Sequence, residues 1–175
     1  MDRGRTRRVP GRTTFSGDRG RARSARTDHG GIRSSFPRAG QVNLPGIKDE
    51  PRWITESTLL AIHAQQVERY GGLHGVRDNN VVLSALARPE HRRTYDRSAD
   101  LTDLAAAYVV GFATTQGFND GNKRTGLACA LVFLSINGAN LHVPPVELIA
   151  LTMAVANGKE DETKAGSYFR KQLLK

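Results

Sequence analysis

Apolar residues recur at intervals of three and four from residue 52 to the end of the chain, the spacing of helices that bury one face. The pattern predicts six helices and, at residues 140–143, one short extended piece. This order of elements predicts an all-α domain, a compact helical bundle without internal repeats. We expect five of the helices at residues 57–69, 78–88, 99–115, 144–158 and 161–174. The remaining helix, the fourth along the chain, is expected to end near residue 136.

Capping and breaking residues support these boundaries. Thr55 and Asp78 precede the first and second helices, where a short polar side chain can accept hydrogen bonds from free backbone N–H groups. Gly71 is expected to end the first helix and Gly138 the fourth, because glycine readily adopts the left-handed conformation after a helix. Pro89 is expected to end the second helix near residue 88.

A stretch rich in polar and charged residues, 116–125, lies directly before the fourth helix. Either Asn119 or Asp120 is expected to cap that helix. Lys123 and Arg124 then fall in its first turn, where cations oppose the helix dipole at a cost of about 0.3–1 kcal/mol each. A sequence selected for stability alone would carry acidic residues there.

An anion bound at this helix end would explain both cations, because it would pair with them and accept hydrogen bonds from the free N–H groups. Gly121 would let the backbone approach that anion closely. Asp120 could hold Mg²⁺, which usually takes one or two carboxylates plus phosphate oxygens. The alternative is that Asp120 is only a cap and that Lys123 and Arg124 only form a solvated face.

The stretch resembles the Fic/Doc (Fido) motif, His-x-Phe-x-Asp/Glu-Gly/Ala-Asn-Gly/Lys-Arg, and more closely that of the Doc branch, the death-on-curing toxins. Lys123 favours Doc, since AMP-transferring members usually have glycine there, and Leu127 stands where the longer motif has a second arginine. The matching positions are Phe118, Asp120, Gly121, Asn122, Lys123 and Arg124. Residues 53–55, 69–73, 76–78, 85–89 and 137–138 also resemble Doc sequences, so that the resemblance covers residues 52–175.

The resemblance implies a Fic/Doc-type helical bundle whose motif loop binds the phosphates of ATP. Phe118 would be the buried anchor of the loop, and Asp120 would coordinate Mg²⁺. Catalysis would involve Asp120, Lys123, Arg124 and position 116. The phosphate-binding segment would consist of Phe118, Asn119, Gly121, Asn122, Lys123, Arg124 and Thr125.

The resemblance also implies an activity and two partners. In Doc-like members the nucleotide binds in a reversed orientation, and its terminal phosphate goes to a hydroxyl of an EF-Tu-type translation factor. The expected result is arrested translation in a bacterial cytoplasm. A Phd-like antitoxin, whose disordered C-terminal segment folds as a helix into a groove, would be the usual second partner.

Gln116 departs from the motif, which has a histidine there as general base. Glutamine has no titratable proton, and a positioned base typically contributes about 10²–10⁴-fold to a rate. We therefore expect impaired catalysis and retained nucleotide binding. Three explanations stay open: a degenerated toxin, a substitution introduced to permit expression, or another group that supplies the base. For His63, on the first helix, a packing role is favoured over a catalytic one.

The net charge of +9 belongs wholly to the N-terminal part of the chain. Residues 1–48 hold 12 Lys and Arg against three Asp and Glu, whereas the remaining residues hold 14 of each. With hardly any apolar residues, this Arg-rich segment is predicted to be a disordered tail attached to a Fic/Doc-like domain at residues 52–175. It could be an upstream translation artefact, a basic arm that binds nucleic acid or the ribosome, or a targeting peptide.

The composition excludes several classes of protein. No run approaches the roughly 20 apolar residues of a membrane span, no Cys/His spacing suits zinc, and Cys129 is expected to be a buried structural thiol. The leading hypothesis is a Doc-like toxin domain with impaired catalysis. The alternatives are a non-catalytic binding protein, which would keep nucleotide or antitoxin binding and take part in repression of its own operon, and a nucleic-acid-binding protein that acts through residues 1–48.

Overall fold

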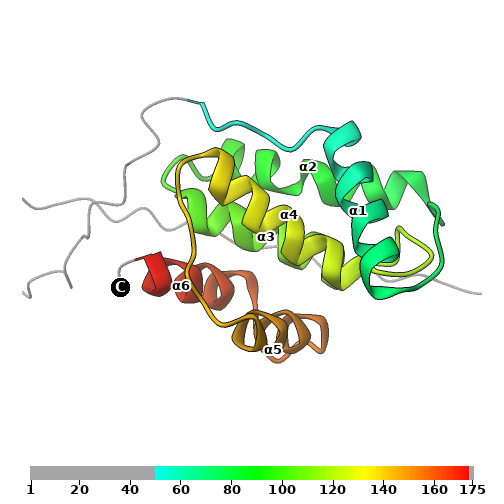
Figure 1. Ribbon diagram of the computed structural model, residues 1–175. Coiled ribbons are helices and arrows are strands. Elements are labelled where there is room, and N and C mark those ends of the chain that lie inside the picture. Colours follow the sequence, from blue (N-terminus) through cyan, green and yellow to red (C-terminus); the bar gives the residue numbers. More distant parts are fainter. Residues whose placement is uncertain (1–49, 174–175) are drawn as a thin grey trace, which may run out of the picture. The chain divides into compact units, whose positions relative to one another are not determined.

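The computed structural model describes residues 50–173, which contain six α-helices and no strand (Figure 1). The prediction of an all-α fold is confirmed. The predicted disordered tail at residues 1–48 lies outside the described residues. Within them, no helix has the length and hydropathy needed to cross a membrane. The helices are α1 (Glu56–Tyr70), α2 (Asn79–Tyr95), α3 (Leu101–Ala113), α4 (Asn122–Ile136), α5 (Pro145–Ala156) and α6 (Glu162–Leu173).

Helix α3 forms the centre of the bundle and packs against α2, α4, α5 and α6 (Figure 1). Ten of its 13 residues are buried, most of them small or apolar. At Gly126 of α4, an added Cβ would lie 3.0 Å from Cβ of Phe112 and 3.2 Å from the carbonyl oxygen of Val109, so the two helices pack closely here and a larger residue would require them to shift. This close packing fixes the start of α4 relative to the end of α3, and the motif loop connects these two points.

Local signals placed most helix ends correctly. The side chain of Thr55 caps α1, and the side chain of Asp78 accepts hydrogen bonds from two backbone N–H groups of α2. Gly71 ends α1, and Gly138 follows α4 with a φ of 80°. Residues 140–143, predicted as a short extended piece, have no regular secondary structure.

The predicted end of α2 at Pro89 is wrong, because the helix continues through this proline to Tyr95. A proline inside a helix costs about 3 kcal/mol, and α2 contains this proline together with contacts to another helix. Pro89 itself is buried. On either side of it, Arg88 and Arg92 both form ion pairs with Glu162 of α6, at 2.9 and 3.5 Å. Tertiary contacts, which sequence spacing does not reveal, therefore decide the length of α2.

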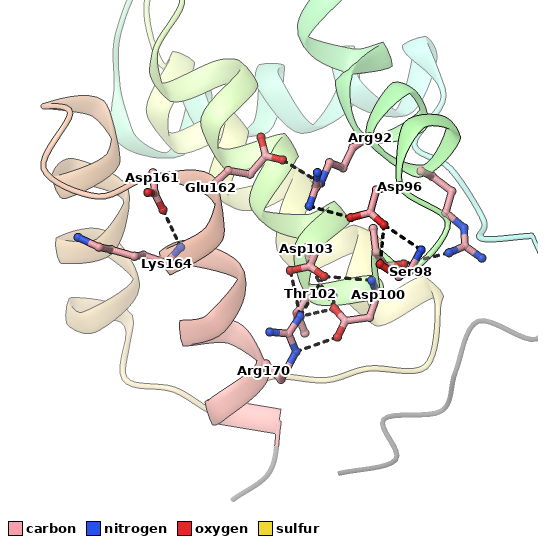
Figure 2. A network of polar contacts seen from close by, with 12 residues as sticks. Arg92, Asp96, Ser98, Asp100, Thr102, Asp103, Asp161, Glu162, Lys164 and Arg170 are labelled. Atoms are coloured by element: carbon pink, nitrogen blue, oxygen red, sulfur yellow. Dashed lines mark hydrogen bonds and ion pairs between the residues drawn. The ribbon is translucent and has the colours of Figure 1, made fainter. Parts of the chain in front are cut away.

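The start of α3 is closed by a network of polar contacts that also holds α6 (Figure 2). Asp100 and Asp103 form a capping box, in which each side chain accepts from the other residue's backbone N–H. Arg170 of α6 donates to the Asp100 carboxylate at 2.8 Å and to that of Asp103 at 2.9 Å. Burial raises the pKa of Asp100, but hydrogen bonds from Arg170 and Thr102 outweigh it and leave the pKa below its ordinary value.

Candidate functional site

Phe118 anchors the loop between α3 and α4. Its ring is fully buried and stacks on the imidazole of His63 from α1, with 3.8 Å between the ring centroids and 10° between the planes. The ring of Phe112 lies 6.1 Å away. The backbone N–H of Phe118 donates to the side-chain oxygen of Asn122, whose amide nitrogen donates back to the Phe118 carbonyl. Asn122 thus closes the loop onto the first residue of α4.

Helix α4 begins without a side-chain cap, so the predicted cap at Asn119 or Asp120 is wrong. The N-cap is Gly121, with a φ of 74°. The amide of Asn119 instead donates to the carbonyl oxygen of His74, and Asp120 accepts from the adjacent backbone N–H of Gly121. Both short polar side chains are used to shape the loop. The N–H groups of the first turn of α4 consequently stay free for another acceptor.

Two cations occupy this uncapped turn, as the sequence predicted, but they differ in their surroundings. Arg124 lies 3.6 Å from the Asp120 carboxylate, donates to the carbonyl oxygen of Gln66 at 3.5 Å, and has its guanidinium 6.0 Å from the centre of the Tyr70 ring. Lys123 is exposed and forms no ion pair within residues 50–173. One cation is therefore fixed in place, whereas the other is available to an anion.

The segment after α1 packs closely against the loop. Gly72 has a φ of 130°, and an added Cβ there would lie 2.5 Å from a carboxylate oxygen of Asp120 and 3.2 Å from the guanidinium of Arg124. The backbone N–H of Asn119 donates to the carbonyl oxygen of Gly75 at 3.0 Å. Any side chain at position 72 would displace the acid or the cation, so this glycine is part of the site.

Gln116 lies at the edge of the site, and a hydrogen bond holds its side chain. Its side-chain oxygen accepts a hydrogen bond from Arg77 at 2.8 Å. The next residue, Gly117, packs against α2, since an added Cβ would lie 2.6 Å from a methyl carbon of Val82. The loop backbone is thereby fixed beneath Gln116, and the amide side chain is held by a cation.

These residues surround a cleft of about 550 Å³. The predicted site residues that line it are Gln116, Asn119, Asp120, Gly121, Asn122, Lys123 and Arg124. Two predicted residues do not line it, because Phe118 and Thr125 are fully buried. The opposite wall comes from α5, through Met153 and Ala156. The cleft is a polar hollow at an open helix N-terminus, which is a favourable place for an anion.

Among the described residues, Asp120 is the only carboxylate that lines the cleft. Within residues 50–173, no group of three or more His, Cys, Asp or Glu side chains could hold a metal ion by itself. The Asp120 side chain is 49% exposed, and one of its oxygens has no hydrogen-bond partner within the described residues. A single carboxylate of this kind suits Mg²⁺, which keeps several waters and takes further ligands from phosphate oxygens.

His63 is buried, which supports its predicted packing role. One ring nitrogen lies 3.2 Å from the hydroxyl of Thr125, and the other has no partner within the described residues. Burial lowers the pKa of His63, and electrostatic interactions with His74 and Arg124 lower it further. The ring is therefore neutral at neutral pH. Because it lies behind Phe118 and does not line the cleft, it is not placed to act as a base on a group bound there.

Sequence reasoning missed four contributors to the site: Gln66, Tyr70, Gly72 and Met153. The first three lie on or just after α1, about 50 residues before the motif, and they reach it only through the fold. Residues 69–73 were noted as a helix end and as part of the resemblance to Doc sequences, but neither observation placed them at the site. Met153 lies on α5 and is 44% exposed.

Two other features of the described residues do not form a second site. A hollow of about 620 Å³ lies along α2, but its cations Arg88 and Arg92 already pair with Glu162, which lines the same hollow. Cys129 is a buried free thiol, and burial raises its pKa to about 12. It is an unreactive part of the core, as expected.

Comparison with known proteins gives results of two kinds. A family model described as "Fic/DOC family" matches residues 53–134. The "Protein kinase doc" of Escherichia phage P1 is 39% identical over 108 residues, which cover 62% of this chain and 85% of that protein. The "Toxin Doc" of Mycolicibacterium smegmatis (strain ATCC 700084 / mc(2)155) is 42% identical over 74 residues, which cover 41% of this chain and 56% of that protein.

Proposed function

Because the chain belongs to the Fic/Doc family, we propose that it is a Doc-like toxin whose fold is that of a nucleotide-dependent phosphotransferase acting on a protein hydroxyl. The observation that carries this proposal is the uncapped N-terminus of α4, with two cations and no acidic residue in its first turn. The printed names of the two relatives, a protein kinase and a toxin, agree with it. Transfer of a phosphoryl group depends chiefly on positioning and charge neutralisation, which such a site can supply.

In this proposal the cleft holds the phosphates of ATP. The free N–H groups of α4 donate to phosphate oxygens, and Lys123 and Arg124 pair with their charge. Asn119 and Asn122 are already used to hold the loop, so their main contribution is to keep these donors in position. Preorganised donors need no rearrangement when charge develops in the transition state.

Asp120 would hold Mg²⁺ through its oxygen that lacks a hydrogen-bond partner. The ion, when bound, would neutralise charge on the nucleotide phosphates. Arg124 competes for the same carboxylate at 3.6 Å, and Gly72 leaves the space in which the pair lies. The backbone carbonyl of Gln66 and the ring of Tyr70 keep Arg124 beside Asp120.

Gln116 occupies the position from which a base would take the proton of the acceptor hydroxyl. An amide cannot accept that proton, and Arg77 holds its oxygen at 2.8 Å. We therefore propose that this chain binds ATP but transfers phosphate about 10²–10⁴-fold more slowly than the same chain would with a histidine at position 116. His63 does not compensate, because it is buried behind Phe118.

The proposed acceptor is an EF-Tu-type translation factor, and the proposed result is arrested translation in a bacterial cytoplasm. The proposed regulator is a Phd-like antitoxin. Both partners come from the resemblance to Doc toxins. A role in nucleic-acid binding for residues 1–48 stays a separate prediction about a segment outside the described residues.

A second candidate function is a non-catalytic binding protein that keeps nucleotide or antitoxin binding. Gln116 is the specific observation that favours it, since Lys123 and Arg124 line the cleft while position 116 carries no general base. Both candidate functions use the same cleft, and they differ only in whether a phosphoryl group is transferred from the bound nucleotide to an acceptor protein.

A transfer assay with purified EF-Tu, Mg²⁺ and ATP labelled at either the α or the γ phosphate separates these candidates. We compare this chain, the Gln116→His variant and a Gln116→His/Asp120→Asn control. The proposal expects strong labelling of EF-Tu from γ-labelled ATP by the Gln116→His variant and at most weak labelling by the other two. Labelling from α-labelled ATP would indicate AMP transfer instead. No labelling by any protein would favour the binding protein.

A further inference from the structure

The segment before α2 is tied to the motif loop by its backbone. The backbone N–H groups of Arg77 and Asp78 both donate to the carbonyl oxygen of Gly117, at 2.8 and 3.0 Å. Next to these bonds, Val76 and Phe118 form an isolated antiparallel bridge. Asp78 is itself the N-cap of α2, and its side chain accepts from two backbone N–H groups of that helix. The start of α2 therefore fixes Arg77 beside the loop.

The side chain of Arg77 adds a second tie, to Gln116. Its guanidinium donates to the side-chain oxygen of Gln116 at 2.8 Å. A guanidinium carries only donors, whereas an amide has an oxygen that accepts and a nitrogen that donates. Arg77 therefore determines which way round the amide lies, because only the oxygen can face it. Within residues 50–173, Arg77 forms no ion pair, so no carboxylate competes with Gln116 for the guanidinium.

The amide nitrogen of Gln116 is left for a ligand. Gln116 lines the cleft, and the residue that holds its oxygen does not. Nε2 is thus the polar atom that Gln116 can offer to the cleft, and it has no acceptor within the described residues. An amide whose oxygen accepts from a cation is polarised and becomes a stronger donor at its nitrogen. The pair supplies the cleft with an uncharged donor that has a positive charge behind it.

The arginine side chain is not needed to hold the loop. The ties to Gly117 come from backbone N–H groups and would stay with any residue other than proline at position 77. Arg77 is exposed and does not line the cleft, so it does not contact a ligand there itself. Its side chain therefore acts on the cleft through Gln116.

We propose that Gln116 is a binding residue whose Nε2 donates a hydrogen bond to a phosphate oxygen in the cleft, and that Arg77 is the positioning residue that turns this donor toward the ligand. A charged phosphate oxygen is the group such a donor favours, because hydrogen bonds to ionised acceptors are roughly twice as strong as those to neutral ones. This role rests on the proposed function, since it adds Gln116 to the groups that hold the phosphates of ATP. Position 116 then contributes to binding instead of to proton transfer.

The test is a double-mutant cycle on the full chain, in which calorimetric titration measures the affinity for ATP in the presence of Mg²⁺. Gln116→Leu keeps the size of the side chain but has no hydrogen-bonding group, and it should weaken binding by about three- to tenfold. Arg77→Leu should weaken it by about two- to fivefold, because the amide loses its fixed orientation. The double variant should bind no more weakly than Gln116→Leu alone, since Arg77 acts through Gln116. Gln116→His keeps an N–H donor and should bind as this chain does.

Arg52→Leu is the matched control for the loss of a positive charge. Arg52 is exposed, and its backbone N–H donates to the side chain of Asn137, the residue that ends α4, so it lies at the end of the helix away from the cleft. Its affinity for ATP should be unchanged. Urea denaturation confirms that each variant folds.

A second measurement reads the hydrogen bond itself. NMR spectra of the isotope-labelled chain contain the side-chain NH₂ signals of Gln116, which are assigned by their loss in Gln116→Leu. We expect these signals to move downfield when ATP is added, and to move less in Arg77→Leu.

Three results would overturn the proposal or part of it. Unchanged affinity of Gln116→Leu, with ATP still bound, would remove the binding role of Gln116 and leave the proposed function standing. A double variant that loses the product of the two single effects would show that Arg77 acts on the ligand through its own charge. If ATP does not bind at all, the proposed function fails, and titration with pyrophosphate then decides: a shift of the Gln116 signals upholds the donor, and no shift overturns it.

Discussion

Helices α3 and α4 are neighbours, and their N-termini are capped in opposite ways. At α3, Asp100 and Asp103 form a capping box, and Arg170 closes it from outside (Figure 2). At α4, the cap is a glycine, no side chain accepts from the first turn, and both charged residues there are cations. At α3 the free backbone N–H groups find acceptors within the protein. At α4 the N–H groups and the positive charge are available to a ligand.

This difference separates stability from binding within one fold. Acidic residues at a helix N-terminus are stabilising and cations there are not, so α4 gives up a small amount of folding free energy at the motif. The closed end of α3 ties α6 to the bundle and contributes nothing to the cleft. Substitutions at the two ends should therefore affect different measurements.

The largest effect is expected from Lys123→Glu. Replacing the unpaired cation by an acid should weaken ATP binding by about 100-fold, because a charge-assisted contact becomes a repulsion. The same change should raise the free energy of unfolding by about 0.5–1 kcal/mol, since an acid suits the first turn. Calorimetric titration with ATP and urea denaturation check the two parts. Weaker binding together with lower stability would mean that Lys123 supports the fold.

Asp100→Ala tests the capped N-terminus of α3 and should change stability but not ATP binding. Loss of the cap and of the hydrogen bond from Arg170 should lower the free energy of unfolding by roughly 2 kcal/mol, while the affinity for ATP stays unchanged. Urea denaturation and the same titration measure both quantities. Asp78→Ala, which removes only a cap from α2, is the matched control and should cost about 1 kcal/mol. Equal losses for both variants would show that Arg170 adds nothing.

A smaller effect is expected from pH. The pKa of Asp100 is held below its ordinary value, so its ionised form stabilises the fold. This contribution is fully present above the unfolded-state pKa of about 3.9 and is lost as the pH falls through the lower folded-state pKa. The stability difference between this chain and Asp100→Asn should therefore shrink as the pH falls below about 4. A difference that stays constant from pH 7 to pH 3 would contradict this assignment.

Local sequence signals predicted the features that local contacts determine. The six helices, the caps at Thr55 and Asp78, and the glycine after α4 follow from spacing and backbone preference, and all are confirmed. The passage of α2 through Pro89 could not be predicted, because the burial of this proline and the ion pairs of the flanking arginines with Glu162 exist only in the folded chain.

In the functional site, too, local features could be predicted from the sequence and long-range contacts could not. The cations of the motif and the cleft around them were predicted from ten consecutive residues. The cap of α4 was predicted wrongly, because Asn119 is drawn to the carbonyl of His74 and Asp120 is turned toward Arg124. The contribution of Gly72 could not be foreseen, since only the fold brings it against the acid.

The central claim is that Gln116 removes the general base but leaves the phosphate-binding cleft intact. Its most direct test is calorimetric titration of this chain and its Gln116→His variant with ATP, in the presence and absence of Mg²⁺. The account predicts affinities that agree within about twofold, both strengthened by Mg²⁺ and both reduced by Lys123→Glu. Absence of ATP binding by this chain, with binding restored by Gln116→His, would contradict it, because Gln116 would then disrupt the cleft itself.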